Sequence, residues 1–251
     1  MVRTLGNSIG ACNERKNASN FRPVKVPLPK RVHLALRTRL LDGSLPPGTR
    51  LDYKQLSVEL GVSTTPVREA VTQLASEGFV ELIPRLGAVV RSLTRNSAME
   101  FYEVREAVET FAAMKAAERL SERHLEQLRQ HLGSMRRMYE ETSARGSSQL
   151  ESADLFTFLD ADIAFHKTVL LAARNPALAR TVEESHIQSR IFYADRGVHD
   201  TVRLSLACQQ HADILAALEK RDGPTAAEAM RSHIRTSLDF TLEHLEASLE
   251  I

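Results

Sequence analysis

Three histidines and one aspartate stand on helical stripes that otherwise hold apolar residues. Asp162 and His166 are four residues apart, a spacing that puts both side chains on one face of a helix. His211 and His233 interrupt two further apolar stripes, one on each side of a Gly-Pro turn at 223–224. A polar side chain in such a position is either hydrogen-bonded within the core or holds a ligand.

The distances of the two later histidines from this turn predict that they meet. His211 lies about 12 residues before it and His233 about 10 after it, so each stands roughly 15–18 Å away along its helix. In an antiparallel pair the imidazoles then share one level. With Asp162 and His166 they predict a site of three nitrogens and one oxygen. Such a site suits one divalent transition metal (Zn²⁺, Ni²⁺, Mn²⁺ or Fe²⁺) and disfavours Ca²⁺.

Arg105 is a second charged residue on an inward stripe, here between Phe101 and Val108. A buried guanidinium needs a fixed anion. Two partners are open: a carboxylate of the protein, or the carboxylate of a ligand that also touches the metal. The second alternative predicts a small organic acid as effector. Three residues on one face of a later predicted helix are expected to complete the polar lining: His186, Arg190 and Tyr193.

Length and composition limit the kinds of domain that can position these residues. The chain has 251 residues, enough for one large or two ordinary domains. Residues 1–95 carry about 15 Lys and Arg against about 7 Asp and Glu, while the remainder is acidic, which suggests that only the first part meets a polyanion. Two cysteines form no disulfide framework. No apolar run predicts a membrane span or a signal peptide, so we expect a cytoplasmic protein without membrane contact.

Periodicity and turn signals predict a mainly helical protein in two domains. Residues 1–27 are predicted to be a flexible tail, 28–95 a winged helix-turn-helix of three helices and a small β-hairpin, and 96–251 an antiparallel bundle of six or seven helices. The second helix is predicted to open at Asp52, with Gln55 as its capping-box partner. The third is predicted to start near Thr65, with Pro66 in its first position.

The winged helix-turn-helix order predicts DNA binding, because its third helix presents N-terminal residues to base edges in the major groove. A small helical domain with solvated charges is the alternative. Outward positions of the third helix are Thr64, Thr65, Arg68 and Thr72, and Arg85 and Gly87 lie in the predicted wing. Arginine can contact a phosphate or guanine, and threonine a phosphate or a thymine methyl.

The sequence of this segment resembles the GntR family of transcription regulators. The resemblance covers residues 28–93 and rests on two stretches, Gly43-Ser44-Leu45-Pro46-Pro47-Gly48-Thr49-Arg50-Leu51 and Leu60-Gly61-Val62-Ser63-Thr64-Thr65-Pro66-Val67-Arg68-Glu69-Ala70-Val71. It implies DNA contacts by Thr65, Arg68 and Gly87, and Arg50 is added to the predicted set. The family often has a basic residue where Thr64 stands, so no base contact is carried over to that side chain.

Residues 97–243 more loosely resemble the FCD ligand-binding domain of the FadR-like branch of this family. The shared features are Asp162-Ile163-Ala164-Phe165-His166, Asn175-Pro176 and the spacing from His211 to His233. The resemblance implies a divalent metal at these positions and an arginine facing the effector. Gln210 stands where a glutamate often precedes the histidine.

These features predict a ligand-responsive, homodimeric regulator that binds duplex DNA at an inverted repeat, most simply a repressor released by a small carboxylate. A metal-dependent helical hydrolase fused to a DNA-binding domain is the alternative from another class. Its general base and nucleophile are not evident in the sequence. A third hypothesis makes the metal purely structural, in a bundle that only dimerises.

Overall fold

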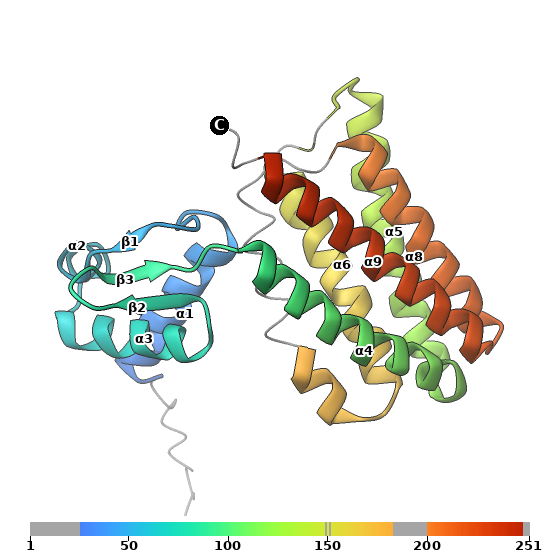
Figure 1. Ribbon diagram of the computed structural model, residues 1–251, viewed down its shortest axis with the longest axis horizontal. Coiled ribbons are helices and arrows are strands. Elements are labelled where there is room, and N and C mark those ends of the chain that lie inside the picture. The colour runs from blue at the N-terminus through green and yellow to red at the C-terminus, as the bar shows by residue number, and fades with distance from the viewer. Residues whose placement is uncertain (1–25, 149, 151, 183–199, 248–251) are drawn as a thin grey trace, which may run out of the picture.

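The computed structural model describes residues 26–148, 150, 152–182 and 200–247 (Figure 1). Two groups of elements succeed one another along the chain. A small helical lobe with a three-stranded sheet comes first, and a bundle of long helices comes second (Figure 1). The predicted fold class is confirmed. No helix in these ranges is both long and apolar enough to cross a membrane. His186, Arg190 and Tyr193 lie outside the described residues.

The N-terminal lobe has the order of a winged helix-turn-helix. Its elements are α1 (Leu28–Leu41), β1 (Arg50–Leu51), α2 (Tyr53–Glu59), α3 (Thr64–Ser76), β2 (Val80–Ile83) and β3 (Gly87–Val90). The predicted hairpin is β2 and β3, paired antiparallel from Val80 with Val90 to Ile83 with Gly87. The sequence did not predict β1, which pairs with β3 at the edge of the sheet. Two residues are too few to show the alternating pattern of a strand.

Apolar stripes on α1 and α3 form the core of this lobe. Leu36, Val67 and Leu74 are fully buried, and they pack with the inner faces of the hairpin strands. These are the stripes expected from the sequence. They fix α3 against α1, so that the opposite face of α3 stays in solvent.

Two local predictions in this lobe need correction. The Asp52 side chain accepts from the backbone N–H groups of Lys54 and Gln55, but the Gln55 side chain donates to Glu59 rather than returning to the cap. The capping box is therefore only half formed. Helix α3 begins at Thr64, so Pro66 is its third residue and not its first. Proline is tolerated there because N–H groups of the first turn have no partner within the helix.

In the described part of the bundle the long helices are α4 (Arg95–Arg119), α5 (Glu122–Ala144), α6 (Ser152–Ala172), α8 (Thr201–Glu219) and α9 (Gly223–Ala247). A short helical stretch at residues 176–182 follows α6. Helix α4 packs mainly along α9, which lies beside it in Figure 1, while α5 contacts both α6 and α8. Thr94 and Ser121 form capping boxes that fix the starts of α4 and α5. Buried apolar residues from all five helices share one core.

The start of α9 is held close to α4. A Cβ at Gly223 would lie 3.1 Å from the backbone oxygen of Met114. This distance is too short for ordinary contact, so any side chain at this position would require the neighbouring backbone to shift by a few tenths of an ångström. Glycine thus lets α9 begin at a fixed height against α4. A turn between α8 and α9 is observed, but it lies at residues 220–222, so the predicted position needs correction: Gly223 and Pro224 are the first two residues of α9.

Candidate functional site

The structure brings together the three histidines and the aspartate singled out from the sequence. One ligand atom from each of Asp162, His166, His211 and His233 lies within 4.8 Å of the others. They come from α6, α8 and α9. The imidazoles are 0–3% exposed, whereas the Asp162 side chain is 25% exposed. The predicted convergence at one level of the bundle is therefore observed.

His166, His211 and His233 form the histidine cluster, and in each imidazole Nδ1 is hydrogen-bonded to an oxygen that can only accept. The acceptors are the Glu109 carboxylate for His166 at 2.5 Å, the backbone carbonyl of Ala207 for His211 at 2.7 Å, and the Gln210 side-chain oxygen for His233 at 3.1 Å. An acceptor of this kind requires a proton on Nδ1, which leaves the lone pair of a neutral imidazole on Nε2. Such supporting contacts fix the tautomer and orientation of metal-binding histidines.

The three Nε2 atoms and the carboxylate then face one another. Nε2 of His166 is 3.2 Å from Nε2 of His233, and Nε2 of His211 is 3.2 Å from an Asp162 carboxylate oxygen. Among the described residues, Nε2 of His211 has no hydrogen-bond partner. Ligand atoms that converge in this way could hold one cation between them. Two ligands on one ion of about 2.1 Å bond length are at most about 4 Å apart, so a small contraction would complete the site.

Burial and mutual contact shift the titration of this cluster toward the metal-binding form. Burial lowers the pKa of His166, and the Glu109 carboxylate opposes this without reversing it. Burial and the two neighbouring imidazoles hold the pKa of His233 well below its ordinary value. Burial alone would raise the pKa of the Asp162 carboxyl, but the contact with His211 and the other imidazoles keep it well below the usual range. Two neutral imidazoles and an ionised carboxylate are the forms that bind metal.

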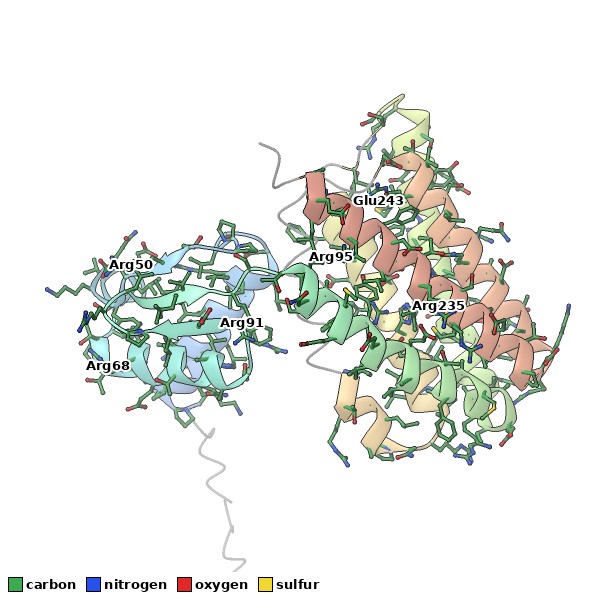
Figure 2. All side chains as sticks on the ribbon, viewed as in Figure 1. Arg50, Arg68, Arg91, Arg95, Arg235 and Glu243 are labelled. Atoms are coloured by element: carbon green, nitrogen blue, oxygen red, sulfur yellow. The ribbon has the colours of Figure 1, made fainter. Side chains whose placement is uncertain are left out.

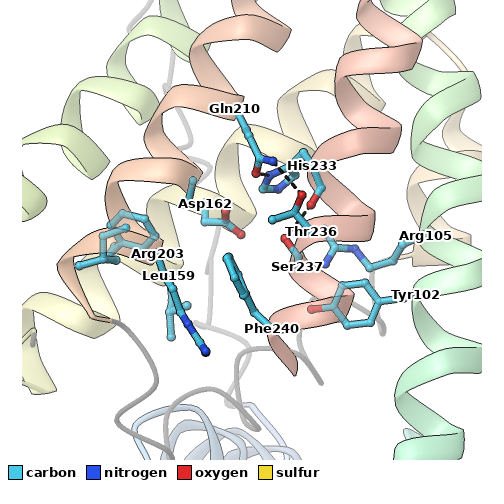
Figure 3. Close-up of a pocket in the computed structure, with 13 residues that line it drawn as sticks. Tyr102, Arg105, Leu159, Asp162, Arg203, Gln210, His233, Thr236, Ser237 and Phe240 are labelled. Carbon is cyan, nitrogen blue, oxygen red and sulfur yellow. Dashed lines mark hydrogen bonds between the residues drawn. The ribbon is translucent and has the colours of Figure 1, made fainter. Parts of the chain in front are cut away.

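A pocket opens beside the cluster, and Arg105 lines it from α4 (Figure 3). The Arg105 side chain is buried, with its guanidinium 5.3 Å from the centre of the Tyr102 ring. Asp162 and His233 line the same pocket from α6 and α9. The inward direction expected for Arg105 is therefore observed, and it faces the histidine cluster across this pocket (Figure 3).

The sequence left the partner of Arg105 open, and the structure supplies one. Nε of Arg105 donates to the Glu109 carboxylate at 2.7 Å, while its buried Nη2 has no hydrogen-bond partner within the described ranges. Burial would lower the pKa of the guanidinium, but Glu109 raises it above the ordinary value, so Arg105 stays charged. The Glu109 carboxylate is thus an internal partner for Arg105, and the Nη2 donor group of Arg105 remains available to a ligand.

Glu109 and Arg203 are cluster or pocket residues that sequence reasoning missed, and Gln210 was noted only as a departure from the family pattern, without its contact to His233. Glu109 is 1% exposed and four residues after Arg105, a spacing usually taken for a surface ion pair. Its position on the inward stripe, one turn before Ala112 and Ala113, was the available signal. Arg203 lies at the pocket with its guanidinium 4.6 Å from the centre of the Phe240 ring. His186, Arg190 and Tyr193 belong to the part of the chain that the structure leaves undescribed.

The other expected contact surface is the solvent face of α3 with the wing. Thr64, Thr65, Arg68 and Thr72 are exposed, as are Arg50, Arg85 and Gly87. Arg50 and Arg68 lie at the end of the lobe that points away from the bundle (Figure 2). Four of the predicted residues line one hollow between α2, α3 and the wing: Arg50, Thr64, Arg68 and Gly87.

The remaining predicted residues lie around this hollow. Thr65 and Thr72 continue along α3, and the Thr72 hydroxyl donates to the Arg68 carbonyl at 2.9 Å. Arg85 forms the wing tip in a left-handed backbone conformation, with φ of 67°. Tyr53 and Lys54 line the hollow too and were not predicted. The Arg68 guanidinium stands 5.2 Å from the centre of the Tyr53 ring.

Family comparisons match both groups of elements. The family described as "Bacterial regulatory proteins, gntR family" matches residues 28–90, and the FCD domain matches residues 100–236. The chain belongs to the gntR family. This gntR-family protein is 29% identical over 210 residues to the HTH-type transcriptional repressor RspR of Escherichia coli (strain K12). The aligned residues cover 83% of this chain and 86% of that protein.

Two further comparisons agree with this assignment. The gluconate operon transcriptional repressor of Bacillus subtilis (strain 168) is 36% identical over 158 residues, 63% of this chain and 56% of that protein. The solved structure of E. coli McbR/YncC shares the fold, with a TM-score of 0.71 at 22% identity, over 87% of this chain and 99% of that one. This gntR-family protein is a DNA-binding transcription regulator, and the hydrolase alternative is not supported.

Proposed function

We propose that this regulator is a repressor that leaves its operator when a small organic acid binds beside a divalent metal ion. The observation that carries the proposal is the spare Nη2 of Arg105, buried and without a partner among the described residues, in the pocket that Asp162 and His233 also line. A guanidinium donates in a planar fork that matches a carboxylate. This arrangement favours an anion with at least one further oxygen.

In this proposal, one ion per chain is held by Asp162, His166, His211 and His233. The donor set of three imidazoles and one carboxylate fits Zn²⁺, Ni²⁺, Mn²⁺ or Fe²⁺. Support comes from Nε2 of His211, which makes no hydrogen bond among the described residues and stands beside the Asp162 carboxylate, and from the supporting contacts on every Nδ1. When bound, such an ion supplies a Lewis-acidic point for a carboxylate or hydroxyl oxygen of the effector.

The proposed ligand class is a sugar acid, a hydroxy acid or a dicarboxylate. The B. subtilis relative is named for the gluconate operon, and gluconate is a sugar acid. The pocket surface combines apolar groups such as Phe158 and Phe240 with hydroxyl and amide groups from Thr236, Ser237 and Gln210. Hydroxyl groups on a ligand would find partners there.

The proposal places DNA contacts on Arg50, Thr64, Thr65, Arg68, Thr72, Arg85 and Gly87, with the boundary between the DNA-binding and effector-binding domains near residue 95. The active species is a homodimer on an inverted repeat, as two-fold symmetry of protein and operator would require. Because its target is chromosomal DNA, it works in the cytoplasm. Ligand binding acts on DNA affinity only if the ligand binds more tightly to one arrangement of the two winged domains.

Titration calorimetry with metal-loaded protein tests the effector site. The panel contains sugar acids, hydroxy acids and dicarboxylates, together with neutral sugars of similar size. Arg105→Lys keeps the charge beside Glu109 but loses the planar fork, so acid binding should weaken about 10–100-fold while metal and DNA binding persist. The exposed Arg235, which pairs with Glu106 outside the pocket, gives the matched control Arg235→Lys.

Tight binding of a neutral sugar that Arg105→Lys does not disturb would refute the acid assignment. Saturation with metal and no response to any ligand would instead favour the purely structural metal. In either case DNA binding measured by fluorescence anisotropy shows whether the regulator itself is intact.

A further inference from the structure

We infer that Glu109 couples the pocket at Arg105 to the histidine cluster, so that an anion on Arg105 and a metal ion on His166 strengthen each other's binding. This inference rests on the proposed function and adds to it a means of regulation. Glu109 is a positioning residue here, because it touches Arg105 and His166 and acts through them.

The geometry of Glu109 links two elements through one carboxylate. One oxygen accepts from Nε of Arg105 at 2.7 Å on the same helix, and the other accepts from Nδ1 of His166 at 2.5 Å on α6. The three side chains are 0–5% exposed. Water therefore does not screen these contacts, and the charge of the carboxylate is shared between a cation and an imidazole.

Both neighbours of Glu109 have a second polar end that points to a ligand position. The Nε2 atom of His166 faces the converging ligand atoms of the histidine cluster. The Nη2 atom of Arg105 is buried and lacks a partner in the described part of the chain. A pair that served only to balance charge within the core would leave no donor over, since an unmade buried hydrogen bond is costly.

The sharing of one carboxylate makes the two ligand positions dependent on each other. A cation at Nε2 of His166 makes its Nδ1–H a stronger donor and draws Glu109 toward the imidazole. Arg105 is then less neutralised and attracts an anion more strongly. The reverse also holds, since an anion on Arg105 frees Glu109 to increase the basicity of His166. Linkage requires the two effects to be equal in free energy.

Metal affinity measured by titration calorimetry with Ni²⁺ alone tests the coupling in the full-length chain. The proteins are wild type, Glu109→Gln, Arg105→Met and the double variant. Glu109→Gln should weaken Ni²⁺ binding about 10–100-fold, as loss of a supporting contact does. Arg105→Met should tighten it, because the Glu109 carboxylate that supports His166 is then no longer shared with Arg105. Without the Glu109 carboxylate this gain should largely disappear. In the Glu109→Gln background, the factor by which Arg105→Met changes Ni²⁺ affinity should be at least about 5-fold smaller than in the wild-type background.

A second pair of variants separates positioning from folding. Glu109→Asp keeps the charge beside Arg105 with a shorter reach, so metal-free thermal stability should stay nearer to wild type while Ni²⁺ affinity falls as in Glu109→Gln. Glu106→Gln is the matched control, because Glu106 is bonded to Arg235 on α9 and to no imidazole of the residues that the structure describes. The visible absorption of Co²⁺-loaded protein should change in the Glu109 variants and not in Glu106→Gln.

Two outcomes would overturn the inference. The first would leave the proposed metal site intact, and the second would refute that site as well. If Arg105→Met changes Ni²⁺ affinity by the same factor with and without the Glu109 carboxylate, the coupling is absent while the proposed metal site stands. If wild-type protein binds no divalent metal, the proposed function falls together with the coupling.

Discussion

The proposed DNA-binding face and the proposed effector pocket each place an arginine over a tyrosine ring, yet the two pairs differ in their surroundings. Arg68 lies 5.2 Å from the Tyr53 ring centre in an exposed hollow, and Arg105 lies 5.3 Å from the Tyr102 ring centre inside the bundle. Only Arg105 is buried and has a carboxylate at 2.7 Å. The same pair is thus open to a polyanion from solvent in the first case, and in the second it suits a single small anion beside the fixed Glu109 carboxylate, as the proposed function requires.

The buried histidine cluster should respond most strongly to substitution, because its ligands act together on one ion. Wild-type protein should contain about one divalent metal per chain, and His211→Ala and His233→Ala should each reduce it to near zero, beyond the roughly 10–100-fold loss typical of a supporting residue. Elemental analysis of purified protein measures this content. His131→Ala, on α5 and outside the cluster, is the control. Wild-type metal content in both cluster variants would place the site elsewhere.

The exposed face should respond in smaller steps, because its contacts are separate. Arg68→Ala should weaken specific DNA binding by about 1–3 kcal/mol, the range for loss of one good contact to a base. Fluorescence anisotropy on the protein's own promoter DNA over a range of salt concentrations gives this value, and affinity should fall steeply with salt. Arg129→Ala, on α5, provides a control arginine with an ion pair to Glu219. Undiminished affinity in Arg68→Ala would remove α3 as the recognition helix.

The aromatic partner of Arg68 should contribute least. Tyr53→Ala removes the ring beneath the guanidinium and should cost about 0.5–1 kcal/mol of DNA affinity at this exposed site. Tyr53→Phe keeps the ring and should bind as wild type in the same anisotropy assay. An equal loss in both variants would mean that the Tyr53 hydroxyl, and not its ring, is what matters.

The sequence predicted the elements that long patterns define. The stripes on α1, α3, α6, α8 and α9 were sufficient to place the helices and to bring His211 and His233 to one level, because helical geometry converts residue count directly into height. Of these helices, α3 was predicted most specifically, because it contains the sequence motif that resembles the GntR family. The two-residue β1 escaped prediction because it carries no period of its own.

The site was predicted less completely than the fold. Ligand atoms could be identified because His and Asp are rare on apolar stripes. Glu109, Gln210 and Tyr53 could not, since their roles depend on contacts across helices or between neighbouring elements. Spacing along one helix shows Glu109 only as a partner for Arg105, while its bond to His166 exists only once α4 and α6 pack together.

The close approach of Gly223 to Met114 has a consequence for how such chains can change over evolution. Each residue inserted into a helix turns the rest of that helix by about 100° and moves it by about 1.5 Å. An insertion between His211 and His233 would turn or shift one of them relative to the other, and a side chain at Gly223 would press on the Met114 backbone of α4. Lineages that keep the cluster should therefore vary in length in the connection between α5 and α6, and hold the segment from α8 to α9 at constant length.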